Sequence, residues 1–266
     1  MTSFIYENTW QENCELFKTK KVAVIPVGSN EQHGPALPTG TDWMLAEYLG
    51  REVGKKSESA VVTPVIPIGH ATYHADFPGT LAVSTATLAA YVREICEDLI
   101  SYGITHILFL NGHGGNNTAL YDVGQELRLR GIPVANIQWF DIAGTFNPEW
   151  GLRGHGDITE TSAMMHVFPE GVKLEKAHLP ENRHLGKIKV LDLHTGEFEG
   201  ASVYLNLRTK DCSEQGDLIE YGHGKDLDYS VSACASTAEL GKECLDACVD
   251  YICRFIEEFK TISFDS

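Results

Sequence analysis

The chain has 266 residues, of which 43% are hydrophobic and 22% charged, so its composition excludes a disordered, collagen-like or low-complexity protein. It contains 21 Lys and Arg and 37 Asp and Glu, which gives a formal net charge of −16. We therefore expect no nucleic-acid partner, because a protein that follows a phosphate backbone needs a basic face. No stretch approaches 18 uninterrupted apolar residues, which predicts no membrane-spanning helix and no membrane partner.

Short, almost wholly apolar runs alternate with helical patterns along the first half of the chain. The runs are typical of parallel strands that are buried on both faces, and they cover residues 22–27, 61–68, 106–110 and 133–139. Apolar residues at helical spacing occur over residues 42–53, 85–102 and 118–129, with Ser84 as the N-cap of the second helix. This alternation predicts an α/β fold with a mainly parallel sheet.

The segment from about residue 173 to 227 interrupts the alternation. It holds a hairpin-like stretch at 187–193, a turn at His194-Thr195-Gly196 and then a polar run. We interpret it as a surface excursion that covers a site or contacts another subunit. An amphipathic helix is expected at 236–260, and the absence of a linker or repeat predicts a single domain over residues 1–266.

The seven cysteines are expected to be free thiols. Their number is odd, no two form a C-x-x-C pair, and four of them lie between residues 234 and 253. The first residues show neither a basic region nor a long apolar run, so no signal peptide is visible. Free thiols without a signal predict a cytoplasmic location.

Polar residues follow the first predicted strand, in a segment that begins at Gly28. Glu31 and His33 are two residues apart, so in extended backbone they point to the same side, and Asp42 lies at the start of the next helix. Sites in open α/β sheets lie beyond the carboxyl ends of strands. Glu, His and Asp together suit Zn, Mn or Fe. Taken alone, however, so short a motif is more often a surface turn.

A second cluster, at residues 111–117, follows the third predicted strand. It contains His113 between glycines, which allow the backbone to approach a ligand closely. Such a turn could also cradle a phosphate, but it has neither G-x-G-x-x-G nor the Lys of a P-loop. His74 lies beyond the second predicted strand. The coincidence of such residues at several strand ends predicts a metal site.

A third cluster, at residues 155–162, carries His155 and Glu160 just before an apolar run. Thr159 or Thr161 could cap the helix that follows, and Glu160 near its start would be stabilised by the helix dipole. Taken alone, this segment fits a helix cap as well as a functional site.

The three clusters together resemble the creatininase (creatinine amidohydrolase) family. The matching motifs are G-S-x-E-Q-H-G-P-x-L-P-x-x-T-D, N-G-H-G-G-N and H-x-x-x-x-E-T-S, with F-P-G-T at 77–80 and A-S-T-A-E-L-G at 235–241. The resemblance spans about residues 22–249. It implies a three-layer α/β/α fold, a homo-oligomer that is commonly a hexamer, and two divalent ions per subunit, with Zn, Mn or Fe as candidates. The implied reaction is hydrolysis of carbon–nitrogen bonds in cyclic or linear amides.

The resemblance also implies roles for individual residues. The implied metal ligands are Glu31, His33, Asp42, His113 and Glu160, with Asp42 shared by both ions. The implied catalytic groups are His155, which moves protons, and Glu160, which is either a ligand or the base that acts on the attacking water. His74 and Trp150 are the expected substrate contacts.

One motif departs from creatininase itself, which has N-G-H-Y-E-N with the Glu as a metal ligand. Gly114 and Gly115 occupy those two positions here, so we expect Glu160 to supply the missing carboxylate. Trp139, Phe140, Phe146 and Trp150 are the aromatic residues that could cover a small planar substrate, with core packing the more common role for Trp139.

Creatinine, hydrolysed to creatine, is the first candidate substrate. A formamide such as a formylaminopyrimidine and a short peptide are alternatives that would use the same attack by water. Two readings outside amide hydrolysis also stay open: a non-catalytic family member that binds metal or ligand, and a sugar- or nucleotide-binding module suggested by the glycine-rich turn.

Overall fold

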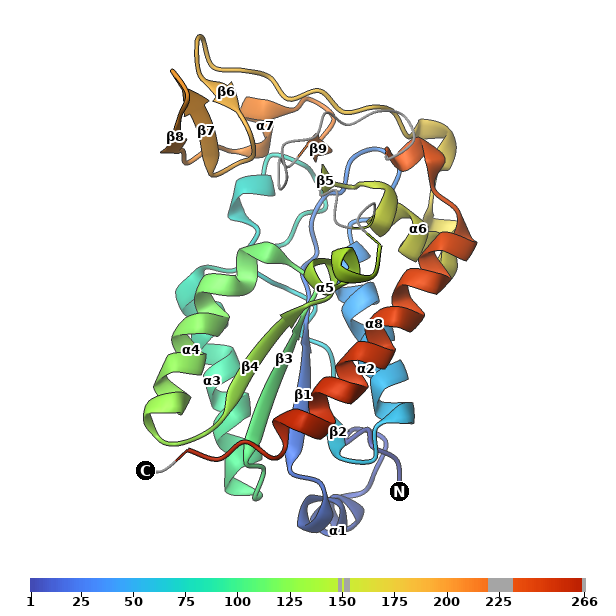
Figure 1. Cartoon of the computed structure of the whole chain (residues 1–266), viewed down its shortest axis with the longest axis vertical. Coiled ribbons are helices and arrows are strands. Elements are labelled where there is room, and N and C mark those ends of the chain that lie inside the picture. Colours follow the sequence, from blue (N-terminus) through green and yellow to red (C-terminus); the bar gives the residue numbers. More distant parts are fainter. Residues whose placement is uncertain (148–149, 151–153, 220–231, 265–266) are drawn as a thin grey trace.

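The computed structural model describes residues 1–147, 150, 154–219 and 232–264 (Figure 1). Its centre is a four-stranded parallel sheet with the strand order β2-β1-β3-β4. Every residue of the two middle strands is buried, as expected of strands covered on both faces. The strands are β1 (Val22–Val27), β2 (Ala60–Val62), β3 (His106–Asn111) and β4 (Val134–Gln138).

Helices cover both faces of this sheet, which confirms the three-layer α/β/α fold (Figure 1). Alternate residues of β1 enter different apolar cores: Val22 and Val24 face one layer, while Ala23 and Ile25 face the other. One layer holds α1 (Trp10–Thr19), α3 (Thr85–Ser101) and α4 (Asn117–Leu129). The other holds α2 (Thr41–Lys56), α5 (Trp139–Phe146), α6 (Ile158–Val167) and α8 (Ala238–Phe259).

The capping residues explain where several helices begin. Ser84 caps α3 as predicted, its side chain accepting a hydrogen bond from the Thr87 N–H at 3.1 Å. The prediction of a threonine cap for α6 is wrong. Asp157 caps that helix and accepts hydrogen bonds from the N–H groups of Thr159 and Glu160.

The second strand is shorter than the apolar run 61–68 predicts. It ends at Val62, and beyond it only an isolated bridge joins Ile66 to Val27. Pro64 and Pro67 interrupt the run, and proline has no N–H to give to a strand ladder.

The carboxyl ends of the other three strands finish in one row. Val27 of β1 pairs with Asn111 of β3, which in turn pairs with Gln138 of β4. The segments that leave these strands therefore begin side by side. This register brings two of the predicted clusters together.

The predicted excursion forms a small unit of its own beyond these strand ends (Figure 1). An antiparallel sheet joins β6 (Lys189–Val190), β7 (Thr195–Phe198) and β8 (Ala201–Tyr204), and α7 (Thr209–Cys212) follows. Four residues form its buried core: Val190, Leu193, Cys212 and Leu218. The chain then returns as β9 (Leu218–Ile219) to pair with β5 (Gly154–His155). Residues 220–227 of the predicted excursion lie outside the described ranges.

The turn predicted at His194-Thr195-Gly196 is displaced. Thr195 and Gly196 belong to β7, and the loop before them covers residues 191–194. The tight turn lies instead between β7 and β8, where Glu199 and Gly200 both have positive φ, as a two-residue hairpin turn requires.

The remaining short elements are the 3₁₀ turns η1 (Thr72–His74), η2 (Gly114–Asn116), η4 (Pro169–Gly171), η5 (Leu174–Lys176) and η7 (Ala233–Ala235). All seven cysteines are free, as predicted. Among the described residues, no helix combines the length and the apolar character needed to cross a membrane.

Candidate metal centre

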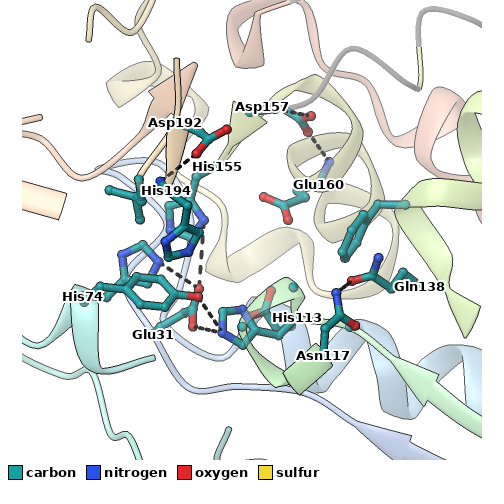
Figure 2. Close-up of a pocket in the computed structure, with 18 of the residues that line it drawn as sticks. Glu31, His74, His113, Asn117, Gln138, His155, Asp157, Glu160, Asp192 and His194 are labelled. Carbon is teal, nitrogen blue, oxygen red and sulfur yellow. Dashed lines mark hydrogen bonds and ion pairs between the residues drawn. The ribbon is translucent and has the colours of Figure 1, made fainter. Parts of the chain in front are cut away.

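A pocket of about 380 Å³ opens beyond the ends of β1, β3 and β4 (Figure 2). Residues of all three predicted clusters line it, and residues 192–195 of the excursion form a further wall. The excursion thus forms part of the pocket wall, as the first of its two interpretations predicts.

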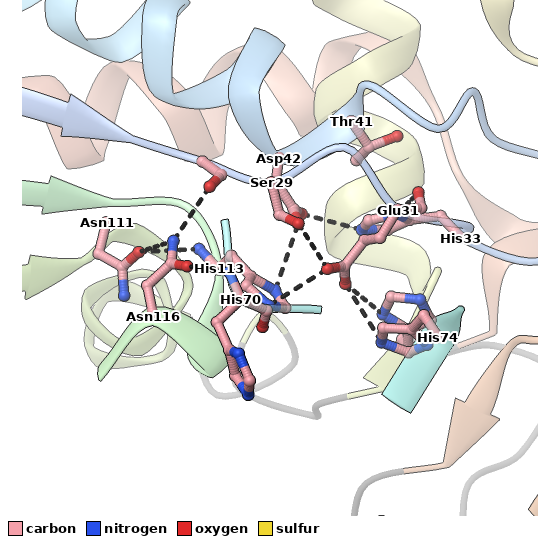
Figure 3. A network of polar contacts seen from close by, with 12 residues as sticks. Ser29, Glu31, His33, Thr41, Asp42, His70, His74, Asn111, His113 and Asn116 are labelled. Carbon is pink, nitrogen blue, oxygen red and sulfur yellow. Dashed lines mark hydrogen bonds and ion pairs between the residues drawn. The ribbon is translucent and has the colours of Figure 1, made fainter. Parts of the chain in front are cut away.

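Two asparagines of the second motif connect the strand ends that carry this pocket (Figure 3). Asn116 is fully buried, and its amide N–H group donates to the Gly28 carbonyl at 3.0 Å and to Asn111 Oδ1 at 3.2 Å. Its own Oδ1 accepts from the His70 N–H. Asn111 Oδ1 also accepts from the His113 N–H, so these side chains fix where His113 leaves the strand.

Glu31 lies at the centre of the site and is completely buried (Figure 3). Its Oε1 is 3.2 Å from His74 Nε2, and its Oε2 is 3.2 Å from His113 Nε2. Ser29 Oγ donates to Oε2 at 2.8 Å. His155 Nδ1 approaches Oε1 at 3.9 Å. Three imidazoles from three separate segments thus converge on one carboxylate.

Asp42, in the first turn of α2, lies between two histidines. Its Oδ1 is 2.9 Å from His33 Nε2, and its Oδ2 is 3.3 Å from His113 Nδ1. Glu160 approaches from α6, with Oε2 at 3.8 Å from the same nitrogen of His33. The Gly156 N–H donates to Glu160 Oε2 at 2.8 Å and holds it in place.

When no cation is bound, protonated histidines balance the negative charge of the buried carboxylates. Burial would raise the pKa of Glu31, but His113 and His74 hold it well below its usual range. Burial would lower the pKa of His33, but Asp42 and Glu160 raise it to about 10. Burial would likewise lower the pKa of His113, and Glu31 raises it well above its usual value. The cluster therefore holds positive charge beside Glu31 and Asp42.

The buried groups on the side of α6 instead have pKa values shifted toward their neutral forms. Burial raises the pKa of Glu160 to about 8 and that of Asp157 to about 6. Burial, together with His33 and His74, lowers the pKa of His155 well below its usual value. A neutral imidazole and a carboxyl group with a raised pKa are suited to exchanging protons.

The donor atoms fit a metal centre. Three groups of residues each bring three possible ligand atoms within 4.8 Å of one another: Glu31, Asp42 and His113; His33, Asp42 and Glu160; and Glu31, His33 and His155. Glu31, His33 and Asp42 each belong to two of these groups, and Asp42 is the residue that joins the group of His113 to the group of Glu160. Moreover, Glu31 Oε1 and Asp42 Oδ2 are buried and accept no well-aligned hydrogen bond from a described residue, having ion-pair contacts with His74 and His113 instead, as expected of oxygens that could face a cation.

The structure thus brings together all five predicted metal ligands and both predicted catalytic residues. The ring of His155 lies between those of His33 and His74, with centroids at 4.2 and 4.4 Å, and is stacked on His74 and tilted relative to His33. Its Nε2 contacts the Gln32 carbonyl, which leaves Nδ1 on the side of Glu31.

The predicted aromatic residues separate into three environments. Trp150 and Phe140 line the pocket, and Trp150 is also buried in the apolar core that contains Trp139, which lies outside the pocket lining. Phe146 lies on the surface against Tyr251. His74, the other predicted substrate contact, lines the pocket beside Glu31.

Tyr73 explains why glycine occupies position 115. A Cβ atom added there would lie 2.3 Å from the Tyr73 hydroxyl, 2.3 Å from the His70 carbonyl and 2.4 Å from His113 Nε2. A larger residue at 115 would require these groups to move. The Tyr73 hydroxyl is 3.2 Å from His113 Nε2.

Sequence reasoning missed several residues of the pocket. Tyr73 directly precedes the predicted site residue His74. Gln138 lies one residue before the end of the fourth predicted strand and is the last residue of β4, so the rule about strand ends could have found it. Asp157 had the signature of an N-cap, with Glu three residues later. No local signal marks Asp192 or His194, which reach the pocket only through the fold of the excursion.

Comparisons with known proteins show which proteins this chain resembles. The mycofactocin precursor peptide peptidase of Mycolicibacterium smegmatis is 32% identical over 163 residues, which are 59% of this chain and 62% of that protein. The match thus spans less than two thirds of that relative. The creatinine amidohydrolase of Pseudomonas putida is 28% identical over 197 residues, which are 65% of this chain and 75% of that protein.

A solved structure described as "Creatininase Mn" has the same fold. It superimposes with a TM-score of 0.74 at 24% identity and covers 97% of this chain and 99% of its own. The family model described as creatinine amidohydrolase matches residues 6–256, nearly the whole chain. The chain therefore belongs to the creatininase family.

Proposed function

We propose that this protein is a metal-dependent hydrolase that cleaves a carbon–nitrogen bond in a small amide, with creatinine as the first substrate to test. The observation that carries the proposal is the position of Asp42, which belongs to two groups of possible ligands at the floor of an open pocket. A cytoplasmic location and assembly into a homo-oligomer, with a hexamer expected, belong to the same proposal.

Two divalent ions would be held by overlapping sets of side chains. One set is Glu31, Asp42 and His113, and the other is His33, Asp42 and Glu160. Such ions supply a water of lowered pKa and polarise the carbonyl that is attacked. Zn and Mn both suit mixed histidine and carboxylate ligands, and Fe is a third candidate.

The surrounding residues would handle the protons of the reaction. His155 donates through Nε2 to the Gln32 carbonyl, so its Nδ1 is the nitrogen able to take a proton on the pocket side and pass it to the leaving amine. Glu160 is the alternative proton carrier if it acts as the base beside His33 instead of as a metal ligand, since its Oε2 lies 3.8 Å from His33 Nε2. His74 and Trp150 would contact the substrate from the pocket wall.

Creatinine is the first candidate because of family membership and the relative from Pseudomonas putida. A short peptide is a second candidate, favoured by the peptidase relative. A formamide is a third, and it would need the same attack on a carbonyl carbon.

The test is hydrolysis of creatinine to creatine by protein reconstituted with Mn or Zn, with metal content measured on the same sample. Creatinine, a formylaminopyrimidine and a short peptide are assayed in parallel with wild-type protein and Asp42→Ala. We expect two ions per chain and turnover of at least one amide, lost in the variant. Two bound ions without hydrolysis of any amide would contradict the proposal and favour a non-catalytic family member.

A further inference from the structure

The excursion places one carboxylate, that of Asp192, on the pocket wall away from the sheet. Figure 2 shows Asp192 and His194 across the pocket from Asn117 and Gln138. We propose that Asp192 determines specificity, and that it selects substrates whose far end carries an amino or guanidino group, preferably a cation. The inference rests on the proposed function, because it assumes that the other end of the substrate lies at the metal ligands.

The other carboxylates that line the pocket already have partners. Asp157 accepts three backbone N–H groups, from Gly154, Thr159 and Glu160, at 3.1, 2.8 and 2.9 Å. The remaining three, Glu31, Asp42 and Glu160, belong to the groups of possible metal ligands. Asp192 has a different environment. Its Oδ1 accepts from the His194 N–H at 2.6 Å, while Oδ2 makes no hydrogen bond to any described residue.

The loop that carries Asp192 is held firmly. The N–H groups of Leu191 and Asp192 both donate to the Thr195 carbonyl, at 2.9 and 3.1 Å. Leu193 is 3% exposed in the small core of the excursion, and the His194 ring contacts Tyr73 edge-on with centroids 5.5 Å apart. A carboxylate on such a loop has a fixed direction, so it can select a substrate without first being ordered.

The charges along the pocket favour a cationic group at this end. No Lys or Arg is found among the described residues that line it. Two divalent ions would carry four positive charges against three carboxylates, so the floor would attract an electron-rich carbonyl. The carboxylate of Asp192 would attract the opposite charge. The pocket would therefore orient a molecule that has a carbonyl at one end and a cationic nitrogen at the other.

The test uses three hydroxamates with the same –CH2–CH2–C(O)NHOH body and different end groups, which can bind an open metal site without being hydrolysed. They are β-alanine hydroxamate, a cation; butyrohydroxamate, which is neutral; and succinate monohydroxamate, an anion. Each is titrated into full-length protein loaded with Co²⁺, and binding is followed by the visible absorption of the metal. The variant Asp192→Asn removes the charge and keeps the acceptor for the His194 N–H. The control Glu197→Gln removes a charge from exposed β7 of the same hairpin, outside the residues that line the pocket.

We expect wild-type protein and Glu197→Gln to bind the cation about tenfold more tightly than the neutral compound, and the anion more weakly still. In Asp192→Asn the cation and the neutral compound should bind within about twofold of each other, with the neutral compound bound as in wild type. Binding of all three compounds without this order in wild type, or an order that survives in Asp192→Asn, would overturn the role of Asp192 and leave the proposed function intact. If no hydroxamate perturbs the Co²⁺ spectrum, or Co²⁺ does not bind, the proposed function is contradicted and the inference falls with it.

Discussion

The strand ends and the excursion both line the pocket, but they differ in how their side chains are fixed. At the strand ends, Glu31 and Asp42 are buried, and the asparagines at 111 and 116 connect neighbouring segments. In the excursion, a core of four residues holds the loop that carries Asp192. If the proposals hold, the buried residues beyond the strand ends would supply most metal ligands, and the excursion would act on the substrate from the opposite wall of the pocket.

The largest effect is expected from Asp42→Ala, which tests whether one strand-end residue supports both proposed ions. Because Asp42 belongs to two of the ligand groups, we expect the variant to lose most of both ions and at least about 100-fold in activity. Metal content per chain measures the first effect directly. Asp122→Ala, which removes an exposed carboxylate from α4, should retain two ions. Two ions retained in Asp42→Ala would contradict the shared role.

Glu160→Gln should remove one ion and leave the other. Of the two possible ligand groups that contain Asp42, only the one with His33 includes Glu160. The substitution weakens that group alone, because an amide oxygen is a weaker ligand than a carboxylate. We expect about one ion per chain and a loss of activity of about 100-fold. Glu170→Gln, on exposed η4, is the matched control. Retention of both ions with the same loss of activity would make Glu160 the base rather than a ligand.

A smaller effect is expected from a substitution of Gly216, where the excursion contacts the segment that follows β1. Gln32 donates through Nε2 to the Gly216 carbonyl at 3.0 Å and contacts His74 Nδ1 at 2.9 Å. Gly216 has φ +98°, and a Cβ atom there would lie 1.8 Å from Gln32 Oε1. Gly216→Ala should therefore lower the free energy of unfolding by about 2–4 kcal/mol and raise KM, because Gln32 is displaced from His74.

The control for this variant separates backbone strain from the clash. Gly200 also has positive φ, +82°, but nothing lies within 4 Å of a Cβ built on it. Gly200→Ala should lower the free energy of unfolding by only about 1–2 kcal/mol and leave KM unchanged. Equal effects in the two variants, measured by denaturant unfolding, would show that the contact with Gln32 is unimportant.

The same contrast explains what sequence reasoning could and could not predict. Glu31, His33 and His113 lie in short motifs that follow apolar runs. The register of parallel strands brings the ends of such runs together independently of the loops between them. The predicted length of the second strand is wrong because the prediction followed the apolar run alone. The two prolines in that run cannot donate hydrogen bonds to a neighbouring strand. Asp192 could not be predicted, because its place depends on contacts such as that of Gln32 with Gly216, which are 184 residues apart.

The smallest effect is expected from Thr209, which joins α7 to the turn that carries His74. Its hydroxyl lies 3.0 Å from the Tyr73 carbonyl and 2.6 Å from His74 Nδ1, and the side chain is fully buried. Thr209→Val keeps the shape and removes the hydroxyl, so it leaves a buried carbonyl without this donor. We expect a loss of about 1–2 kcal/mol in the free energy of unfolding.

The pair of variants at this position separates hydrogen bonding from packing. Thr209→Ser keeps the hydroxyl and removes only a methyl group, at a cost of about 1 kcal/mol. If the hydroxyl positions His74 for substrate, Thr209→Val should raise KM several-fold with metal content unchanged, while Thr209→Ser retains the wild-type KM. An equal KM in the two variants would limit Thr209 to a packing role, because only the hydroxyl reaches His74. The excursion would then act on the substrate through the loop of Asp192 and not through the histidines at the strand ends.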